Sequence, residues 1–296
     1  MLLEHFDKSE FSATISARVS NTQQLPALPE AAQALLRLRN DPNADILDLV
    51  NIVARDPSLA SQVVRYAQLS IFGFGDRITS IQQAIALTLG FESALHLTLG
   101  IAAGKSLETP NDGPLARNIV WAHSLSAAAL TQALAAKMPR EIQPPRGLCY
   151  LAGLMHDFGL LLFGHWYPQH YAELSSRVNR GSETDLRETE LCTFGISHDI
   201  LVKQLMRAWN MPDEIVISCG EHHFSEYDGS HAPLVKLVAL TNQLLDHPIL
   251  NHSSTTLDTS ILLKNLQLTE EQANNSLEKV KESMGEFSNL AKQIAA

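Results

Sequence analysis

Side chains that could bind a metal recur at four places in the second half of this sequence. They are His123, the adjacent His156 and Asp157, His198, and the adjacent His222 and His223. Imidazole and carboxylate groups suit iron, manganese or zinc, and ligands from separate helices can converge inside a helical bundle. Because neighbouring helical residues point about 100° apart, His156 and Asp157 could serve two metals, or one metal and a bridging water. Two cations roughly 3.5–4 Å apart can bind a phosphate and generate hydroxide.

Each of these residues also has a simpler interpretation when it is taken alone. His123 lies among apolar residues and could be a hydrogen-bonded core histidine. His198 could be a solvated residue in the first turn of a helix, and surface pairs such as His222–His223 do occur. His156 and Asp157 could form a buried hydrogen-bonded pair with a purely structural role. Only the combined pattern favours a metal site.

The segments that carry these residues have the pattern of helices. Apolar residues recur at intervals of three and four, and no segment shows the sustained alternation of a half-buried strand. In the first half, an amphipathic helix is expected at 45–55, and Asp56–Pro57 has the composition of a helix start. Further helices are expected near the following ranges: 115–136, 147–163, 167–179, 185–194, 197–209, 212–222, 234–245 and 270–294. The sequence therefore predicts an all-α protein.

The strongest internal break is the polar, proline-containing stretch at residues 109–114. It predicts two helical lobes, at residues 21–108 and 114–250, which together form one domain. Residues 1–20 are expected to be an N-terminal extension, and residues 251–296 to form C-terminal helices that begin after a polar joint at 251–256.

Composition narrows the class of protein. The 296 residues carry a formal net charge of −10, and 45% of them are hydrophobic. This favours a folded globular protein and gives no sign of an extended nucleic-acid-binding surface. The N-terminus lacks the pattern of a signal peptide, and the most apolar stretch, residues 151–163, is too short to span a membrane. Three widely spaced cysteines, Cys149, Cys192 and Cys219, are expected to be buried thiols. A cytoplasmic protein without membrane contact is predicted.

Several motifs, taken in order, resemble those of one family. They are LPALP at 25–29, RDPSLA at 55–60, ITSIQQAI at 78–85, LAGLMHDFG at 151–159, SH at 197–198, WNMP at 209–212 and HH at 222–223. Together they resemble the HDOD (HD-related output domain) branch of the HD superfamily of metal-dependent phosphohydrolases. The resemblance covers most of the chain. It implies a helical lobe packed on an HD-like lobe, in a protein of bacterial signal transduction.

Three departures from the related HD-GYP phosphodiesterases bear on catalysis. Leu160 stands where those enzymes carry a lysine, and Asn242 stands where their last metal-binding aspartate would be. Their GYP loop is also absent. An asparagine offers an oxygen but no charge, so Asn242 would be a weak ligand, and Asp157 would be the one evident anionic ligand. Two cations facing one carboxylate are poorly neutralised.

Two functions follow from the resemblance. The first is a non-catalytic regulatory protein whose degenerate metal pocket binds a ligand or a partner. The second is a metal-dependent phosphohydrolase acting on a phosphomonoester, a nucleotide or a cyclic dinucleotide. In the second, His123, His156, Asp157 and His223 would hold a divalent iron, manganese or zinc, and Asp157 would orient water. His198 and His222 would bind a second metal or the phosphate. No organic cofactor is expected. The expected partner is a signalling protein or a small phosphorylated ligand, and a homodimer is left open.

Overall fold

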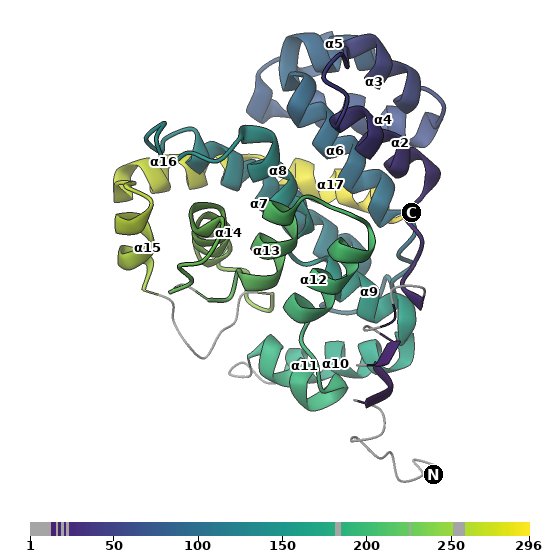
Figure 1. Ribbon diagram of the computed structural model, residues 1–296, viewed down its shortest axis with the longest axis vertical. Helices are drawn as coiled ribbons and strands as arrows, with labels where there is room; N and C mark the ends of the chain where they lie inside the picture. Colours follow the sequence, from purple (N-terminus) through teal and green to yellow (C-terminus); the bar gives the residue numbers. More distant parts are fainter. Residues whose placement is uncertain are drawn as a thin grey trace.

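The computed structural model describes residues 13–15, 17–18, 21, 24–180, 185–224, 226–250 and 258–296, with only the backbone described at 179 and 180. Within these residues every regular element is a helix, which confirms the all-α prediction. Figure 1 shows an upper lobe, a lower lobe and a last helix that runs between them. Most of the predicted N-terminal extension, and the polar joint predicted at 251–256, lie outside the described residues.

The upper lobe is built from the first half of the chain. Its helices are α2 (Glu30–Arg39), α3 (Ile46–Val53), α4 (Pro57–Ala67), the short α5 (Ile81–Gln83), the π-helix η4 (Ala84–Leu89) and α6 (Phe91–Gly104), with a 3₁₀ turn η2 (Ser70–Phe72) after α4. Asp45 begins α3 with a capping box, and the Asp56 carboxylate accepts a hydrogen bond from the backbone N–H of Leu59 at 3.0 Å. The two helices therefore begin where the sequence predicts.

The lower lobe carries all the candidate metal ligands. Its helices are α7 (Arg117–Ala135), α8 (Arg146–Met155), α9 (Phe158–Trp166), α10 (Pro168–Arg180), α11 (Leu186–Phe194), α12 (His198–Ala208), α13 (Asp213–Glu221) and α14 (Ala232–Leu245). The break predicted at 109–114 lies in the non-helical stretch between α6 and α7. The exact domain boundaries stay a prediction.

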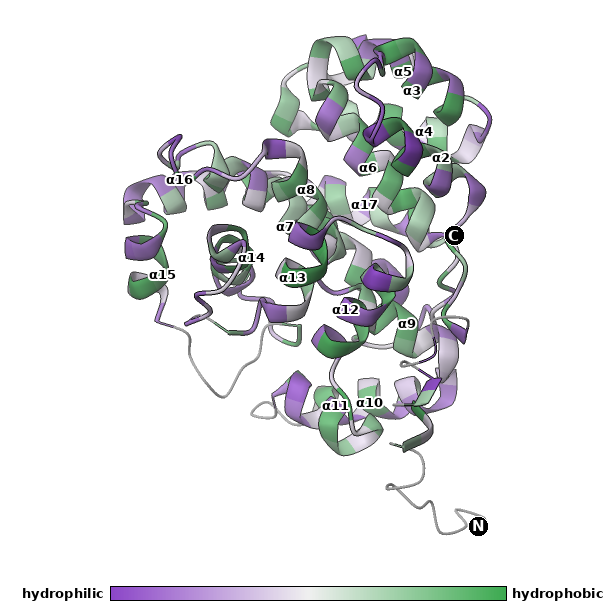
Figure 2. Ribbon diagram, in the orientation of Figure 1, coloured by the Kyte–Doolittle hydropathy of each residue, from purple (hydrophilic) through white to green (hydrophobic). Residues whose placement is uncertain are grey.

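The single helix predicted at 147–163 is wrong. Helix α8 ends at Met155 and α9 begins at Phe158, so the chain turns at His156 and Asp157. Apolar residues continue through the turn, and for that reason the sequence pattern shows no break there. By length and composition, Arg146–Trp166 could also cross a membrane, but its most apolar window is entirely buried inside the protein. Figure 2 shows the hydrophobic colour of α9, which belongs to the core.

The C-terminal helices differ from the expected single helix at 270–294. The chain forms α15 (Thr259–Asn265), α16 (Glu270–Glu282) and α17 (Met284–Ala295), with a break at Ser283. Helix α17 packs on α7 of the lower lobe and on α4 of the upper lobe. Two bonds illustrate this: Gln62 donates to the carbonyl of Gln293 at 3.4 Å, and Arg117 donates to that of Ala295 at 3.3 Å. The last helix thus contacts both lobes.

The expectation of three buried thiols is partly wrong. Cys149 and Cys219 are buried, whereas Cys192 is exposed, and all three are free. Cys192 lies on α11, where it follows the exposed Leu191, so the apolar neighbours that suggested burial do not all face the core.

Candidate metal centre

Six helices of the lower lobe bring the predicted ligands to one place. His123 lies on α7, His156 and Asp157 lie between α8 and α9, and His198 is the first residue of α12. His222 and His223 follow α13, and Asn242 lies on α14. All of these residues are buried except His223, which is half-buried. Residues separated by up to 119 positions in the sequence therefore share one buried cluster.

Asp157 is at the centre of the cluster, between two groups of histidines. Its Oδ2 lies 3.3 Å from Nε2 of His156 and 3.6 Å from Nε2 of His123. Its Oδ1 lies 3.4 Å from Nε2 of His198 and 3.7 Å from Nε2 of His222. One carboxylate thus faces four imidazole nitrogens, two on each oxygen.

The side chains fall into two sets that could each hold an ion. Potential ligand atoms of His123, His156 and Asp157 lie within 4.8 Å of one another, and so do those of His198, His222 and His223. His223 contacts His198, with 2.8 Å between their Nε2 atoms. This grouping differs from the one expected from sequence, which placed His223 with His123 and His156.

Backbone carbonyl groups set the tautomer that His156 and His222 have when their rings are neutral. Nδ1 of His156 lies 2.8 Å from the carbonyl oxygen of Gly153, and Nδ1 of His222 lies 2.8 Å from that of Cys219. A carbonyl oxygen can only accept, so Nδ1 carries the proton in both rings and Nε2 presents its lone pair to the cluster. Metal-binding histidines are oriented by this kind of hydrogen bond.

Glu190 orients a third histidine and was not predicted from the sequence. Its Oε2 accepts the backbone N–H of His198 at 2.9 Å and lies 2.8 Å from Nδ1 of the same residue. Glu190 is fully buried on α11. The sequence hints at this role only through an acidic residue close to His198, and acidic residues are common on exposed helix faces. A second acid, Asp199, pairs with Arg187 at 3.2 Å.

Two residues of the later part of the chain border His123. Oδ1 of Asn242 lies 3.0 Å from Nε2 of His123, so this side chain does stand beside the other ligands. His247, which sequence reasoning missed, packs edge-on against His123 with 5.8 Å between ring centroids. His247 comes just after α14 and has no neighbouring motif that would have singled it out.

Burial and charge set the protonation of the cluster. Burial lowers the pKa of His123 to about 3, against the opposing charge of Asp157. Burial also acts to raise the pKa of Asp157, but the surrounding imidazoles of His156, His198 and His123 outweigh burial and hold that pKa well below its usual range. Burial acts to lower the pKa of His198. The negative charges of Glu190 and, to a smaller extent, Asp157 outweigh burial and raise that pKa to about 9.

Two buried polar atoms of the cluster have no hydrogen-bond partner. They are Oδ2 of Asp157 and Nε2 of His222. A buried polar atom without a partner costs about 1–3 kcal/mol. Both atoms are lone-pair donors that face the cluster, so a cation bound there would satisfy them. The residues present therefore fit a metal ion.

Two glycines allow the helices to approach closely enough to form the cluster. A Cβ at Gly159 would lie 2.1 Å from the backbone oxygen of His198, and a Cβ at Gly153 would lie 2.7 Å from that of Ala127. Gly159 thus brings α9 against the start of α12, and Gly153 brings α8 against α7. Any larger residue would push apart the helices that carry the ligands.

Access to the cluster is narrow. A cavity of about 280 Å³ reaches His123 and His247 and is bounded on one side by Met284 and Ser288 of α17. Leu160, at the position of the lysine in related enzymes, is fully buried in the core. No Lys or Arg of the described residues lines this cavity.

Comparison with known proteins identifies the family. A family model described as the HDOD domain matches residues 25–225. The chain belongs to the HDOD family. An HDOD relationship agrees with the helical lobe and the His–Asp cluster found here, and it confirms the family suggested by the sequence motifs.

Individual relatives of this HDOD protein are distant. An uncharacterized protein of Treponema pallidum (strain Nichols) is 22% identical over 80% of this chain, which spans only 44% of that protein's length. A solved structure of a candidate signal transduction protein from Marinobacter aquaeolei VT8 is 28% identical, with a TM-score of 0.81, covering 100% of this chain and 68% of that one. A candidate phosphohydrolase from Shewanella amazonensis SB2B is 19% identical, with a TM-score of 0.71 over 95% and 98% of the two chains, and shows the same fold.

Proposed function

We propose that this HDOD protein is a signalling protein whose lower lobe holds a divalent transition metal and that the metal centre serves regulation rather than catalysis. The observation that carries the proposal is the arrangement around Asp157, whose two carboxylate oxygens face the Nε2 atoms of four histidines. Two buried lone pairs of this arrangement, on Asp157 and His222, have no hydrogen-bond donor, and a bound cation would satisfy both of them.

The chain offers two sets of ligands for the metal. His123, His156 and Oδ2 of Asp157 form one, with the Asn242 oxygen beside them. His198, His222 and His223, with Oδ1 of Asp157, form the other. Imidazoles with a carboxylate suit iron, manganese or zinc. When bound, such a cation polarises a coordinated oxygen and lowers the pKa of water.

The site has more negative charge to balance a bound cation than the sequence alone indicates. Asp157 is the one carboxylate that faces both groups, but Glu190 lies directly behind His198, and Asp199 lies next to it in the chain. Buried negative charge just outside the ligands raises their basicity and favours a cation. The arrangement supports at least one tightly held metal ion.

Burial favours a regulatory role over catalysis. All the ligands except the half-buried His223 are enclosed, and the cavity that reaches His123, about 280 Å³, is smaller than the usual 300–1,000 Å³ of small-molecule sites. No described cationic side chain lines that cavity to bind a phosphate. A metal in this position would stiffen the junction of α7, α8, α12 and α13, and a change in occupancy would alter the lobe as a whole.

A second function, a metal-dependent phosphohydrolase, is favoured by one observation. Asp157 presents each of its oxygens to a different group of histidines, which is the arrangement required of a carboxylate shared by two metals. The substrate would be a phosphomonoester, a nucleotide or a cyclic dinucleotide. In that case α17 or the segment containing His247 must move to admit it.

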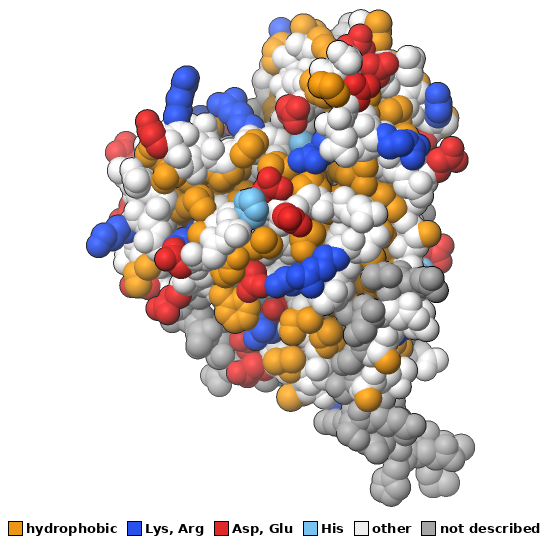
Figure 3. Space-filling model, in the orientation of Figure 1, with side chains coloured by type: hydrophobic (Ala, Val, Ile, Leu, Met, Phe, Trp, Pro, Cys, Tyr) orange, Lys and Arg blue, Asp and Glu red, His pale blue; other side chains and the backbone are white. Residues whose placement is uncertain are grey.

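We further infer that the partner is another signalling protein or a small phosphorylated ligand, in the cytoplasm of a bacterium. The organisms of the relatives support the bacterial source. On the face shown in Figure 3, basic side chains lie singly among acidic and apolar ones, which supports the prediction of no nucleic-acid surface there. A membrane role is not proposed, and a homodimer remains an open prediction.

Elemental analysis of the purified chain tests this proposal. The protein is purified without chelator or metal-affinity resin and compared with Asp157→Ala and with a control, Asp228→Ala, in which an exposed aspartate is lost. We expect near-stoichiometric iron, manganese or zinc in the natural chain and the control, and loss of that metal in Asp157→Ala. Absence of metal from all three refutes the metal centre. Hydrolysis of p-nitrophenyl phosphate or bis(p-nitrophenyl) phosphate that needs both metal and Asp157 would replace the regulatory function with the enzymatic one.

A further inference from the structure

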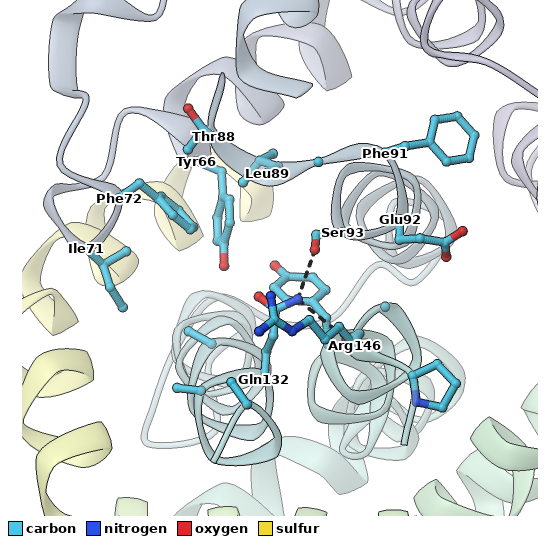
Figure 4. A pocket seen from close by; sticks show the side chains of 17 residues that line it. Tyr66, Ile71, Phe72, Thr88, Leu89, Phe91, Glu92, Ser93, Gln132 and Arg146 are labelled. Atoms are coloured by element: carbon cyan, nitrogen blue, oxygen red, sulfur yellow. Dashed lines mark hydrogen bonds between the residues drawn. The ribbon is translucent and has the colours of Figure 1, made fainter. Parts of the chain in front are cut away.

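A second, larger cavity lies between the two lobes and shares no residue with the metal centre. Its volume is about 770 Å³, within the range of small-molecule sites. From the upper lobe it is lined by residues that include Tyr66, Phe72 and Leu89, and from the lower lobe by residues that include Gln132, Arg146 and Tyr150. Most of the lining surface is apolar, with aromatic rings on both sides. Figure 4 shows this cavity.

Arg146 supplies a positive charge that no carboxylate neutralises. It forms no ion pair or side-chain hydrogen bond within the part of the chain that the structure describes, although it lies at the start of α8 and on the cavity wall. A guanidinium group stays charged at all physiological pH values and binds carboxylates and phosphates through paired N–H groups. Figure 4 shows the Arg146 side chain extending below the hydroxyl end of Tyr66.

The beginning of α6 adds donors to the same wall. Gly90, Phe91, Glu92 and Ser93 line the cavity, and no side chain caps this 14-residue helix. The free N–H groups and the dipole at a helix N-terminus favour an anion. The acidic side chain on this wall, Glu92, lies 3.8 Å from His96 and points away from Arg146 in Figure 4. It therefore leaves the positive part of the cavity open.

Tyr150 provides a buried polar group on the cavity wall. Its side chain is 1% exposed, and its hydroxyl makes no hydrogen bond of normal geometry, although it interacts with the hydroxyl of Tyr66. Burial raises the pKa of both hydroxyls, so both stay protonated donors at neutral pH. Because its contact with Tyr66 lacks normal hydrogen-bond geometry, the buried Tyr150 hydroxyl would gain free energy from a well-placed ligand oxygen.

From these groups we propose that the cavity between the lobes binds a small organic anion, with its carboxylate or phosphate group at Arg146 and its apolar or aromatic body against Tyr66, Phe72 and Leu89. Such a ligand would contact both lobes at once and stabilise their present arrangement. It would also rest on α8, which begins at Arg146 and ends at Met155, directly before His156. The cavity thus shares a helix with the metal centre but none of its ligands.

Two fluorescent probes of nearly the same shape test the site on the full chain. The first, 8-anilinonaphthalene-1-sulfonate, carries a negative charge, and the second, N-phenyl-1-naphthylamine, is neutral. We expect Arg146→Gln to raise the Kd of the anionic probe at least tenfold and to change that of the neutral probe less than twofold. The control Arg140→Gln, an exposed arginine outside the cavity, should change neither. Ala133→Phe, which fills the cavity from α7, should weaken both probes.

The outcomes distinguish anion binding in this cavity from adsorption of the probes elsewhere on the protein. Equal binding of the anionic probe to the natural chain and to Arg146→Gln refutes the proposal, and so does unchanged binding of both probes to Ala133→Phe. If Ala133→Phe fails to fold, the comparison of Arg146→Gln with Arg140→Gln tests the proposal alone. Both of these variants should fold, because both arginine side chains are exposed. Displacement by benzoate or by phenyl phosphate identifies the preferred head group. Asp157→Ala should bind both probes normally, so failure of the metal centre and failure of this site remain distinguishable.

Discussion

Glu190 and His198 form the most closely connected pair in the metal centre: one carboxylate accepts the backbone N–H of His198 and contacts Nδ1 of its ring. Helix α12 begins at His198, so the same contact both starts the helix and sets the ring. The direction of Nε2 toward Asp157, 3.4 Å away, follows from it. A residue outside the sequence motifs therefore determines how one of the motif histidines is presented.

Glu190→Gln should weaken metal binding without removing it. The amide keeps the size of the side chain but loses the charge that supports His198, and such changes typically cost about 10–100-fold in metal affinity. Competition with a chromogenic zinc chelator measures the affinity. Glu188→Gln, on the exposed side of the same helix, is the control and should keep the natural affinity. Equal metal affinities of the two variants would show that Glu190 does not contribute to metal binding.

Asn242→Asp should strengthen metal binding. The asparagine oxygen lies 3.0 Å from Nε2 of His123, so an aspartate there places a second carboxylate next to the first group of ligands. We expect about tenfold tighter binding, equivalent to about 1.4 kcal/mol, and a second equivalent of metal in elemental analysis. Asn242→Ala serves as the comparison and should bind no tighter than the natural chain. If the aspartate variant matches the alanine variant, Asn242 lies outside the metal's reach.

Gly159→Ala should destabilise the protein, whereas Gly285→Ala should not. A Cβ at Gly159 meets the backbone of His198 at 2.1 Å, while one at Gly285 meets nothing within 4 Å. Overpacking in a core costs about 1–3 kcal/mol, and replacing an unhindered helical glycine gains up to about 1 kcal/mol. Urea unfolding followed by circular dichroism measures both free energies. A stable Gly159→Ala variant would show that α9 and α12 can separate at little cost.

Asp56 gives a pH-dependent prediction in the upper lobe. Burial acts to raise its pKa, but the hydrogen bond and charge of Lys105 and the backbone N–H of Leu59 lower it below the ordinary 3.8. A carboxyl whose pKa falls on folding stabilises the protein above its unfolded pKa, and this contribution is lost as the pH drops through the folded value. Asp56→Ala should cost about 1 kcal/mol through the lost cap.

Asp56→Asn separates the cap from the charge. Asparagine is also a good capping residue, so this variant should lose less stability than Asp56→Ala at pH 7. The difference from the natural chain should shrink below about pH 4, where the carboxyl group in the unfolded chain begins to be protonated. Thermal unfolding at low and at neutral pH measures it. A difference that is the same at both pH values would mean that the Lys105 pair contributes nothing.

The sequence predicted the candidate ligands of the centre better than their surroundings. His156–Asp157 and His222–His223 stand out as doublets, and the cap Asp56 is recognisable from the proline that follows it. Glu190 has no such signal because its role depends on how α11 packs against α12. His247 is likewise brought to His123 only by the path of the chain after α14.

The helix breaks inside long apolar patterns could not be predicted from the sequence either. The periodicity of apolar residues continues through Asp157 and through Ser283, yet the structure ends a helix just before each. At Asp157 one helix ends and the next begins, and the turn places the Asp157 carboxylate within 3.3 Å of Nε2 of the adjacent His156. Such turns follow from tertiary packing, which overrides local propensity.

The position of α17 has a consequence for how the protein is made. Gln62 and Gln293, which join α4 to α17, are 231 residues apart. At ribosomal rates of about 5–20 residues per second, α4 would wait roughly 10–50 s for its partner. During that interval, the apolar faces of α4 and α7 that α17 later covers remain open on the nascent chain. Transiently exposed apolar surface promotes aggregation, so a chain that stops before residue 284 is expected to aggregate more readily than the full chain.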